Sequence, residues 1–308
     1  MQRKNITEVT EFIFLGFSIF GKHQITLFVA FLTIYILTLA GDIVIVAIIR
    51  VDHHLRTPMY FFLSMLASSE AVYTLVIVPR MLFSLILHNQ PISWEGCATP
   101  MFFFVTLAVN SGLLLMAMGY DRYVAICNPL RYTVIVSKGT CAGLVCGSFG
   151  TGLVMAVLHV AAMFHLPFWG TVVDHFFCDV YPVTKLSCTD FTINEMINYG
   201  VSSSVILVPV GLIFITYVLL VSTSLKIPSA RGRKKAFATC TSRLTVVVVH
   251  YGCASVIYLK PKSENSIEKD LLSVTYTIVT PLLSPVVYSL RNREVRDALR
   301  RAVGKNTS

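Results

Sequence analysis

The sequence predicts an all-α membrane protein, a seven-transmembrane helix bundle followed by a short amphipathic C-terminal helix. Hydrophobic residues make up 55% of the 308 positions and charged residues only 13%, whereas a soluble domain carries about 25% charge. A membrane-spanning helix needs roughly 20 mostly apolar residues. Seven stretches meet that requirement: 24–49, 59–87, 99–120, 141–164, 197–224, 236–259 and 271–290.

The positive charges predict how this bundle is oriented. With an extracellular N-terminus, most of the 25 Lys and Arg residues fall in the inner loops and the tail, as positively charged residues in short loops do. The net charge of +9 therefore reflects membrane topology, and we expect a lipid bilayer and no nucleic acid as a partner. Residues 1–308 are expected to form one domain: an extracellular segment 1–23, a bundle 24–290 and a cytoplasmic tail 291–308.

The C-terminal segment predicts a helix that lies along the inner leaflet. Arg291–Arg301 is strongly basic, and Val295, Leu299 and Ala302 are spaced to share one side of a helix. Basic residues opposite a narrow apolar face are typical of helices at a membrane surface.

Span 141–164 is rich in small residues. Gly143 and Gly147 form a Gly-x-x-x-Gly motif, which allows two membrane helices to approach closely. Such motifs also recur by chance in glycine-rich spans, so the motif permits a close contact without requiring one.

The third span carries a continuous helical face from one side of the membrane to the other. Its members recur at spacings of four and three: Phe104, Ala108, Ser111, Leu115, Met118 and Arg122. Cys97 and Arg122 are 25 positions apart, which is roughly 37 Å of helix at about 1.5 Å per residue. Because the hydrocarbon core is about 30 Å thick, this face connects the outer mouth of the bundle to a charge near its inner edge. Such a geometry suits a signal carrier.

Asp121-Arg122-Tyr123 alone has an ordinary explanation, a charged pair that anchors the end of an apolar helix. Its surroundings are more specific. Four motifs occur in order along the chain: Pro58–Ser64 (PMYFFLS), Met116–Tyr132 (MAMGYDRYVAICNPLRY), Lys235–Cys240 (KAFATC) and Pro285-x-x-Tyr288-Ser289-Leu290-Arg291-Asn292. Together they resemble the olfactory (odorant) receptor family of rhodopsin-like G-protein-coupled receptors, in its class II, tetrapod-type branch. His250-Tyr251-Gly252, in place of a Trp-x-Pro motif, disfavours an amine or peptide receptor.

The resemblance implies a role for the charged end of the third span. Arg122 would be held by Asp121 at rest and would contact a Gα subunit when the sixth span swings out, with Tyr123, Pro285 and Tyr288 belonging to the same switch. The implied partner is a heterotrimeric G protein with a stimulatory, olfactory-type Gα that raises cyclic AMP. The implied location is the plasma membrane, in the cilia of sensory neurons.

The resemblance also implies a ligand pocket in the outer half of the bundle, between the third, fifth, sixth and seventh spans. Uncharged residues occupy its candidate positions: Phe104, Val105, Ala108, Val109, Ser202, Ser203, Ile206, Leu207, Tyr251, Ala254, Ser255, Tyr258 and Thr277. For any single apolar position, ordinary helix packing is the simpler explanation. Tyr251 and Tyr258 stand out because each hydroxyl needs a partner in a dry site. The expected ligand is a small, volatile, largely apolar odorant with one or two hydrogen-bonding atoms.

The cysteines and one sequon carry further expectations. The resemblance implies a disulfide between Cys97 and Cys178. Relatives pair the position of Cys188 with a further cysteine, but this chain has Trp169 there, so Cys188 is an odd cysteine. Asn5 begins an Asn-Ile-Thr glycosylation sequon on the expected outer side.

No metal site is expected from the histidines and cysteines. His175, Cys178 and Asp179 are spaced as metal ligands, but the implied disulfide removes the thiolate that zinc would need.

Two acids within the apolar spans depart from the family pattern. Asp42 stands where relatives have Asn, and Glu70 where they usually have Asp; Ser284 likewise replaces an Asn. Family geometry brings these three together with Ser111 in the middle of the membrane. Intramembrane acids cost roughly 3 kcal/mol each on insertion scales, so Asp42 and Glu70 are expected to share a proton or hold a sodium ion. A water-filled structural network is the open alternative, and no other cofactor is expected.

Two other classes of protein fit less well. A transporter or channel would show internal repeats and polar residues along both halves of a path, whereas the inner half here is apolar. An enzyme would need a nucleophile with its base or a metal set, and the eight histidines form no H-E-x-x-H motif.

Overall fold

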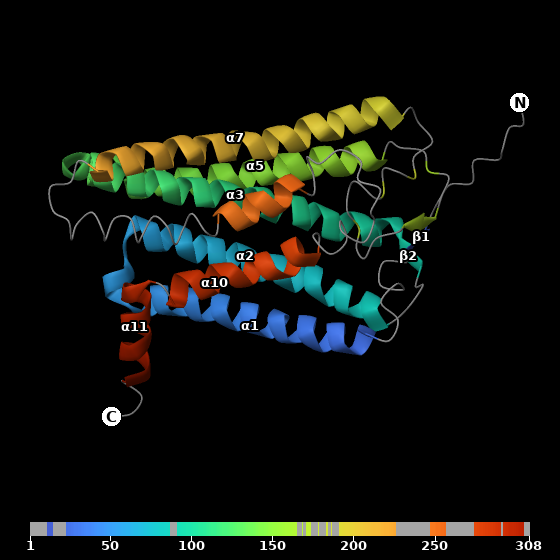
Figure 1. Cartoon of the computed structure of the whole chain (residues 1–308), viewed down its shortest axis with the longest axis horizontal. Coiled ribbons are helices and arrows are strands. Elements are labelled where there is room, and N and C mark those ends of the chain that lie inside the picture. Colours follow the sequence, from blue (N-terminus) through green and yellow to red (C-terminus); the bar gives the residue numbers. More distant parts are fainter. Residues whose placement is uncertain are drawn as a thin grey trace, which may run out of the picture.

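The computed structural model describes residues 11–14, 23–86, 91–164, 168, 171–173, 178, 183, 186, 191–225, 247–256, 274–290 and 292–304. Long helices run side by side, with a small sheet at one end and α11 lying across the other end (Figure 1). Below, these are called the sheet end and the α11 end.

Five described helices are long and apolar enough to cross a membrane. They are α1 (Gln24–Val51), α2 (Pro58–Ile86), α3 (Trp94–Cys127), α5 (Lys138–Phe164) and α7 (Phe191–Leu225). They confirm the first five predicted spans. The described part of the sixth span is a helix, Val247–Val256, and the seventh comprises η4 (Thr275–Val279) and α10 (Thr280–Leu290).

The helix α3 is longer than its predicted span. The Ser93 hydroxyl accepts a hydrogen bond from the Gly96 backbone amide at 3.2 Å, and Glu95 lies in the first turn, where a negative charge favours the helix dipole. Hydropathy marks only the apolar part of a helix, so it misses turns that capping adds.

The sheet was not predicted. Its strands β1 (Glu11–Phe14), β2 (Pro91–Ser93) and β3 (Val172–Val173) lie in the order β2-β1-β3, with β1 antiparallel to β2 and parallel to β3. Strands of two to four residues show too little alternation to be recognised, and their partners are far away in the sequence. Phe12 is fully buried beneath this sheet, with ring centroids 5.5 Å from Trp94 and 5.6 Å from Phe168.

The implied disulfide is confirmed. Cys97 in the first turn of α3 is bonded to Cys178, and both side chains are buried in the same apolar cluster as Phe12. The segment between α5 and α7 is therefore tied to α3 covalently through Cys178 and to strand β1 through β3.

The helix α3 is central, because it packs against α2, α5 and α7. It approaches α5 closely at Gly152, where an added methyl group would lie 2.4 Å from the Thr106 carbonyl oxygen. The close contact that Gly143 and Gly147 would permit is not made by the described residues, since nothing lies within 4 Å of a methyl group added at either position. A Gly-x-x-x-Gly motif shows that a close contact is possible but not which side of the helix makes it.

The predicted C-terminal helix is confirmed as α11 (Arg293–Gly304), and its apolar face includes Val295 and Leu299 as expected but Ala298 in place of Ala302. Val295 and Ala298 are buried against the bundle, Leu299 is half-buried and Ala302 is exposed. The short helices η2 (His53–Leu55), η3 (Pro129–Arg131) and α4 (Tyr132–Ile135) lie in the first and second loops of the same end.

Candidate functional site

The predicted face of α3 is buried in the bundle. Phe104, Ser111, Leu115 and Met118 are all at most 5% exposed, and Ala108 and Arg122 are half-buried. The spacing of four and three therefore identified the side of α3 that meets its neighbours.

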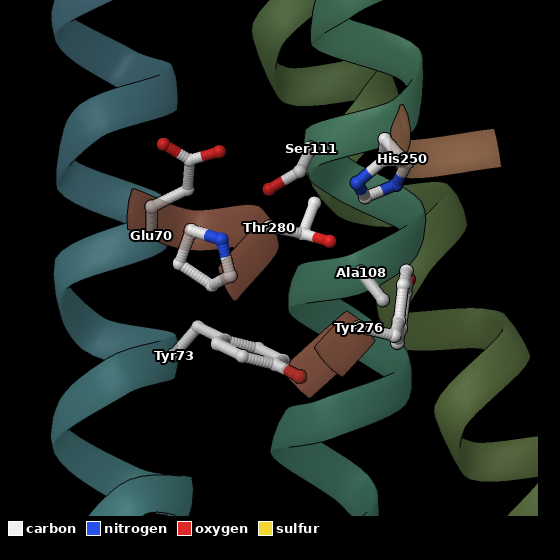
Figure 2. A pocket seen from close by; sticks show the side chains of 8 residues that line it. Glu70, Tyr73, Ala108, Ser111, His250, Tyr276 and Thr280 are labelled. Atoms are coloured by element: carbon white, nitrogen blue, oxygen red, sulfur yellow. The ribbon is translucent and has the colours of Figure 1, made fainter. Parts of the chain in front are cut away.

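A small cavity lies against this face. Residues from α2, α3, helix Val247–Val256, η4 and α10 line it: Glu70, Tyr73, Ala108, Ser111, His250, Tyr276, Thr280 and Pro281. Figure 2 shows Glu70 and Tyr73 on one side and Ala108 and Ser111 on the other, with His250, Tyr276 and Thr280 completing the wall.

Aromatic rings frame one side of the cavity. The centroid of Phe104 lies 5.8 Å from that of Tyr73 and 6.4 Å from that of Tyr276, and His250 lies 5.6 Å from Tyr276. Such distances are typical of aromatic pairs that pack by their edges. These contacts link α2, α3 and the sixth and seventh helices into one rigid wall.

Three residues that the sequence singled out line the cavity: Ala108 from the predicted pocket, and Glu70 and Ser111, which were expected in the polar network. Phe104 belongs to its aromatic frame. Other predicted ligand residues lie elsewhere in the bundle interior, buried in the case of Ile206, Tyr251, Ala254 and Thr277 and half-buried in the case of Val105, Val109, Ser203 and Ser255.

Leu207 is not brought to the cavity. Its side chain is 57% exposed on the outer surface of α7, while its neighbour Ile206 is 5% exposed. The side chain of Ser202 is not described, and Tyr258 lies outside the described residues, as do Asn5, Trp169 and Cys188.

Five cavity residues were missed as lining residues by sequence reasoning: Tyr73, His250, Tyr276, Thr280 and Pro281. Tyr73 had a usable signal, because it follows the intramembrane acid Glu70 by three positions and so shares its side of α2. His250 had another, as an ionisable residue within an apolar span.

The two intramembrane acids are both buried. Asp42 is 0% exposed and Glu70 is 6% exposed. Glu70 and Ser111 line the same cavity, as the family geometry implies. Neither carboxylate oxygen of Asp42 has a hydrogen-bond partner among the described residues, and the side chain of Ser284 is not described. Their gathering with Glu70 stays a prediction.

A buried polar junction beside Ser111 was also missed. Asn110 donates a hydrogen bond from Nδ2 to Ser69 Oγ at 3.0 Å, and Ser148 Oγ donates to Asn110 Oδ1 at 3.0 Å. Ser69 and Ser111 hydroxyl oxygens lie 3.5 Å apart. The junction joins α2, α3 and α5, so it fixes the rotation of α3 and with it the direction of Ser111.

At the α11 end, Asp121 has a partner that the sequence did not suggest. Its carboxylate is 1% exposed and accepts a hydrogen bond from Tyr132 Oη in α4 at 2.7 Å. Burial, together with this carboxylate as acceptor, raises the pKa of the Tyr132 phenol above its ordinary range, so Tyr132 remains a donor. The segment between α3 and α5 is thereby held against the end of α3.

The Arg122 side chain is directed at α2, where its guanidinium group contacts the Met59 sulfur. Tyr123 is half-buried. Pro285 is buried where α10 meets α1, so close that a methyl group at Gly41 would lie 2.7 Å from its Cβ. The side chain of Tyr288 is not described, and the holding of Arg122 by Asp121 stays a prediction.

No group of three or more His, Cys, Asp or Glu side chains that could hold a metal ion occurs within the described ranges. His175 and Asp179 lie outside those ranges.

The chain matches the olfactory receptor family over residues 31–306. It is 79% identical to olfactory receptor 10J5 of Mus musculus and 78% identical to olfactory receptor 10J5 of Homo sapiens, each alignment covering 100% of both chains. It is 63% identical to olfactory receptor 10J1 of Homo sapiens, over 99% of this chain and 95% of that one. With its apolar helices and its α3 motif, the chain belongs to the olfactory receptor family: it is a seven-transmembrane, G-protein-coupled odorant receptor and not an enzyme.

Proposed function

We propose that this receptor binds a small, largely apolar odorant in the cavity beside α3 and activates a stimulatory, olfactory-type Gα, which raises cyclic AMP. One observation carries the proposal: Ala108 and Ser111, which line the cavity, lie on the same face of α3 as Arg122. Ala108 and Arg122 are 14 residues apart, or about 21 Å of rigid helix. A ligand that moves α3 at the cavity therefore moves Arg122 as well.

The chemistry of the cavity supports a small ligand with few polar atoms. The cavity is small, so a large ligand would have to displace its lining side chains. Aromatic rings and Ala108 supply its apolar surface, while Ser111, Thr280, Glu70 and His250 offer a few hydrogen-bonding groups. The Thr280 hydroxyl is buried and has no partner among the described residues, so a ligand hydroxyl or carbonyl group would satisfy it.

The test uses a cyclic AMP reporter in cells that express the full-length receptor, first screened against a chemically diverse odorant panel. Ala108→Leu adds three carbon atoms to the cavity wall and is expected to lower the potency of agonists at least tenfold. Leu207→Ala is the matched control, because that side chain lies on the exposed surface of α7, and its dose–response curve should stay as in wild type. Equal effects of the two substitutions would rule out the cavity as the odorant site. Loss of the response in wild type when stimulatory Gα is deleted tests the choice of G protein separately.

We further propose that Asp42 and Glu70 share a proton or hold a sodium ion. Burial of both acids supports this, because burying two ionised carboxylates within an apolar bundle is costly. Asp42→Asn, which restores the amide usual in relatives, is then expected to change how odorant potency depends on sodium and pH. Identical sodium and pH profiles for the variant and wild type would instead favour a neutral, hydrated network.

The plasma membrane, in the cilia of sensory neurons, is the proposed location, with an extracellular N-terminus and a glycan on Asn5. The disulfide supports this orientation, since disulfides form in the oxidising lumen of the secretory pathway and not in the cytosol. An epitope tag placed before residue 11 should be stained by its antibody on intact cells. A tag placed after Ser308 should be stained only after the cells are permeabilised.

A further inference from the structure

The helix α11 is anchored to the bundle at both of its ends, by two different kinds of contact. Near its C-terminal end, Arg301 Nη2 lies 2.6 Å from Asp52 Oδ2 in the first inner loop. This ion pair is exposed on the Arg301 side, and the hydrogen bond from Arg301 holds the pKa of Asp52 well below its usual range. Near its N-terminal end, the contact is to Tyr60 in the first turn of α2.

The contact is buried on the Tyr60 side and is made by a hydrogen bond. The Tyr60 side chain is 1% exposed. Its Oη donates a hydrogen bond to Glu294 Oε2 at 2.5 Å and lies 3.4 Å from Asn292 Oδ1. Asn292 in turn accepts a hydrogen bond from the Glu294 backbone amide at 3.0 Å, which caps the first turn of α11. Tyr60 therefore binds the capped start of α11 and the acid in its first turn.

Met59, the residue before Tyr60, contacts Arg122. Met59 is 5% exposed, and its sulfur is the contact of the Arg122 guanidinium group. Consecutive residues of a helix point about 100° apart, so one turn of α2 contacts α3 through Met59 and α11 through Tyr60. A shift of this turn changes both contacts at once.

We propose that Tyr60 is a positioning residue for Arg122, and that its hydrogen bond to Glu294 couples the docking of α11 to the placement of the Arg122 guanidinium group. With Tyr60 held by Glu294, the first turn of α2 is fixed and Met59 packs against Arg122. When Arg122 leaves Met59 to contact a G protein, this turn loses a packing partner, and its hold on α11 weakens. Reciprocity requires that loosening α11 at Tyr60 also loosens Arg122.

The proposal rests on Arg122 as the G-protein contact but not on the type of Gα or on any odorant. The proposal gives Tyr60 and Asp52 different roles, because the Asp52–Arg301 ion pair holds α11 without contacting the turn that contains Met59. Loss of either anchor should loosen α11, but only loss of the Tyr60 anchor should reach Arg122.

The test is hydrogen–deuterium exchange on the full-length receptor in lipid nanodiscs, without ligand or G protein. Tyr60→Phe keeps the ring and removes only the hydroxyl, so the fold is expected to persist. Because a hydrogen bond to a charged group contributes roughly 1.5–3 kcal/mol, about a tenfold change or more in an equilibrium, α11 amides should exchange about tenfold faster. The amides of the peptide that contains Arg122 should also exchange faster. Glu294→Gln should have a similar effect, and the double variant should not exceed Tyr60→Phe alone.

Two controls decide the coupling. Asp52→Asn should speed exchange only in the last turn of α11, around Arg301, and leave the Arg122 peptide as in wild type. Arg122→Gln should speed exchange in α11, whereas Arg131→Gln, at an exposed arginine of the same end, should not. Three results would overturn the proposal. The first is wild-type exchange of the Arg122 peptide in Tyr60→Phe, and the second is exchange of that peptide in Asp52→Asn as fast as in Tyr60→Phe. The third is wild-type exchange of the α11 amides in Arg122→Gln.

A second readout separates this result from the proposed Gα. Nucleotide exchange on purified stimulatory Gα, without odorant, should differ between Tyr60→Phe and wild type and not between Asp52→Asn and wild type. Equal nucleotide exchange in wild type and Tyr60→Phe, measured where wild type does stimulate Gα, would overturn the coupling. A wild-type receptor that does not stimulate this Gα at all contradicts only the proposed Gα, and the deuterium pattern then decides the role of Tyr60.

Discussion

Replacement of Arg122 by Ala is expected to abolish odorant-evoked cyclic AMP while the receptor still reaches the cell surface. Arg122 is half-buried at the end of α3, and its guanidinium group packs on Met59. Truncation leaves Met59 under-packed, a cost that a bundle with an extensive core should tolerate. The charge that we expect to contact Gα is lost completely. The other residues of this face of α3, from Phe104 to Met118, are uncharged.

The measurement is the maximal cyclic AMP response at matched surface staining. Arg131→Ala is the control, because Arg131 is exposed in η3 at the same end of the bundle, and it should retain most of the response. An Arg122→Ala receptor that responds fully would contradict the switch role of this residue.

Replacement of Cys97 by Ser should prevent the receptor from reaching the surface. The disulfide closes a loop of 81 residues, and on the chain-entropy model this contributes about 4 kcal/mol. Both sulfur atoms lie in the apolar cluster beneath the sheet, so the substitution also buries an unpaired hydroxyl and thiol. That sum is comparable to the net stability of many domains.

Flow cytometry of unpermeabilised cells measures the effect, with thermal unfolding of any receptor that can be purified. Cys146→Ser is the matched control, because Cys146 is a free cysteine exposed on α5; it should be expressed as wild type. Normal surface expression of Cys97→Ser would show that β1 and the aromatic cluster hold the second outer loop without the disulfide.

The helices and the face of α3 were predictable because the signals involved are local and repeated. Apolar stretches long enough to span a bilayer are read directly, and the spacing from Phe104 to Arg122 selects one side of a helix. The disulfide and the receptor family followed from motifs that this chain shares with its relatives. The acids Asp42 and Glu70 were recognisable because charge within an apolar span is rare.

Other features depend on neighbours that are distant in the sequence. The strand β1 is recognisable only beside β2 and β3, and Gly152 rather than Gly143 makes the close contact because α5 turns that side to α3. Leu207 has the composition of a pocket residue but lies on the exposed surface of α7. Its side is set by how α7 packs against α3, which a short sequence pattern does not encode.

The sequence by itself determined the apolar helices and the face of α3 that ends in Arg122, and its charges predicted the orientation of the bundle in the membrane. Hydrophobic length, charge and helical period are properties of each segment, so they need no partner to be read. The tertiary structure alone decided which side chains meet. Glu70 and His250 line one cavity, Tyr132 donates to Asp121, Arg122 contacts Met59 and Tyr60 donates to Glu294. Those contacts arise from the rotation and crossing of packed helices, which are set by the fit of many side chains at once.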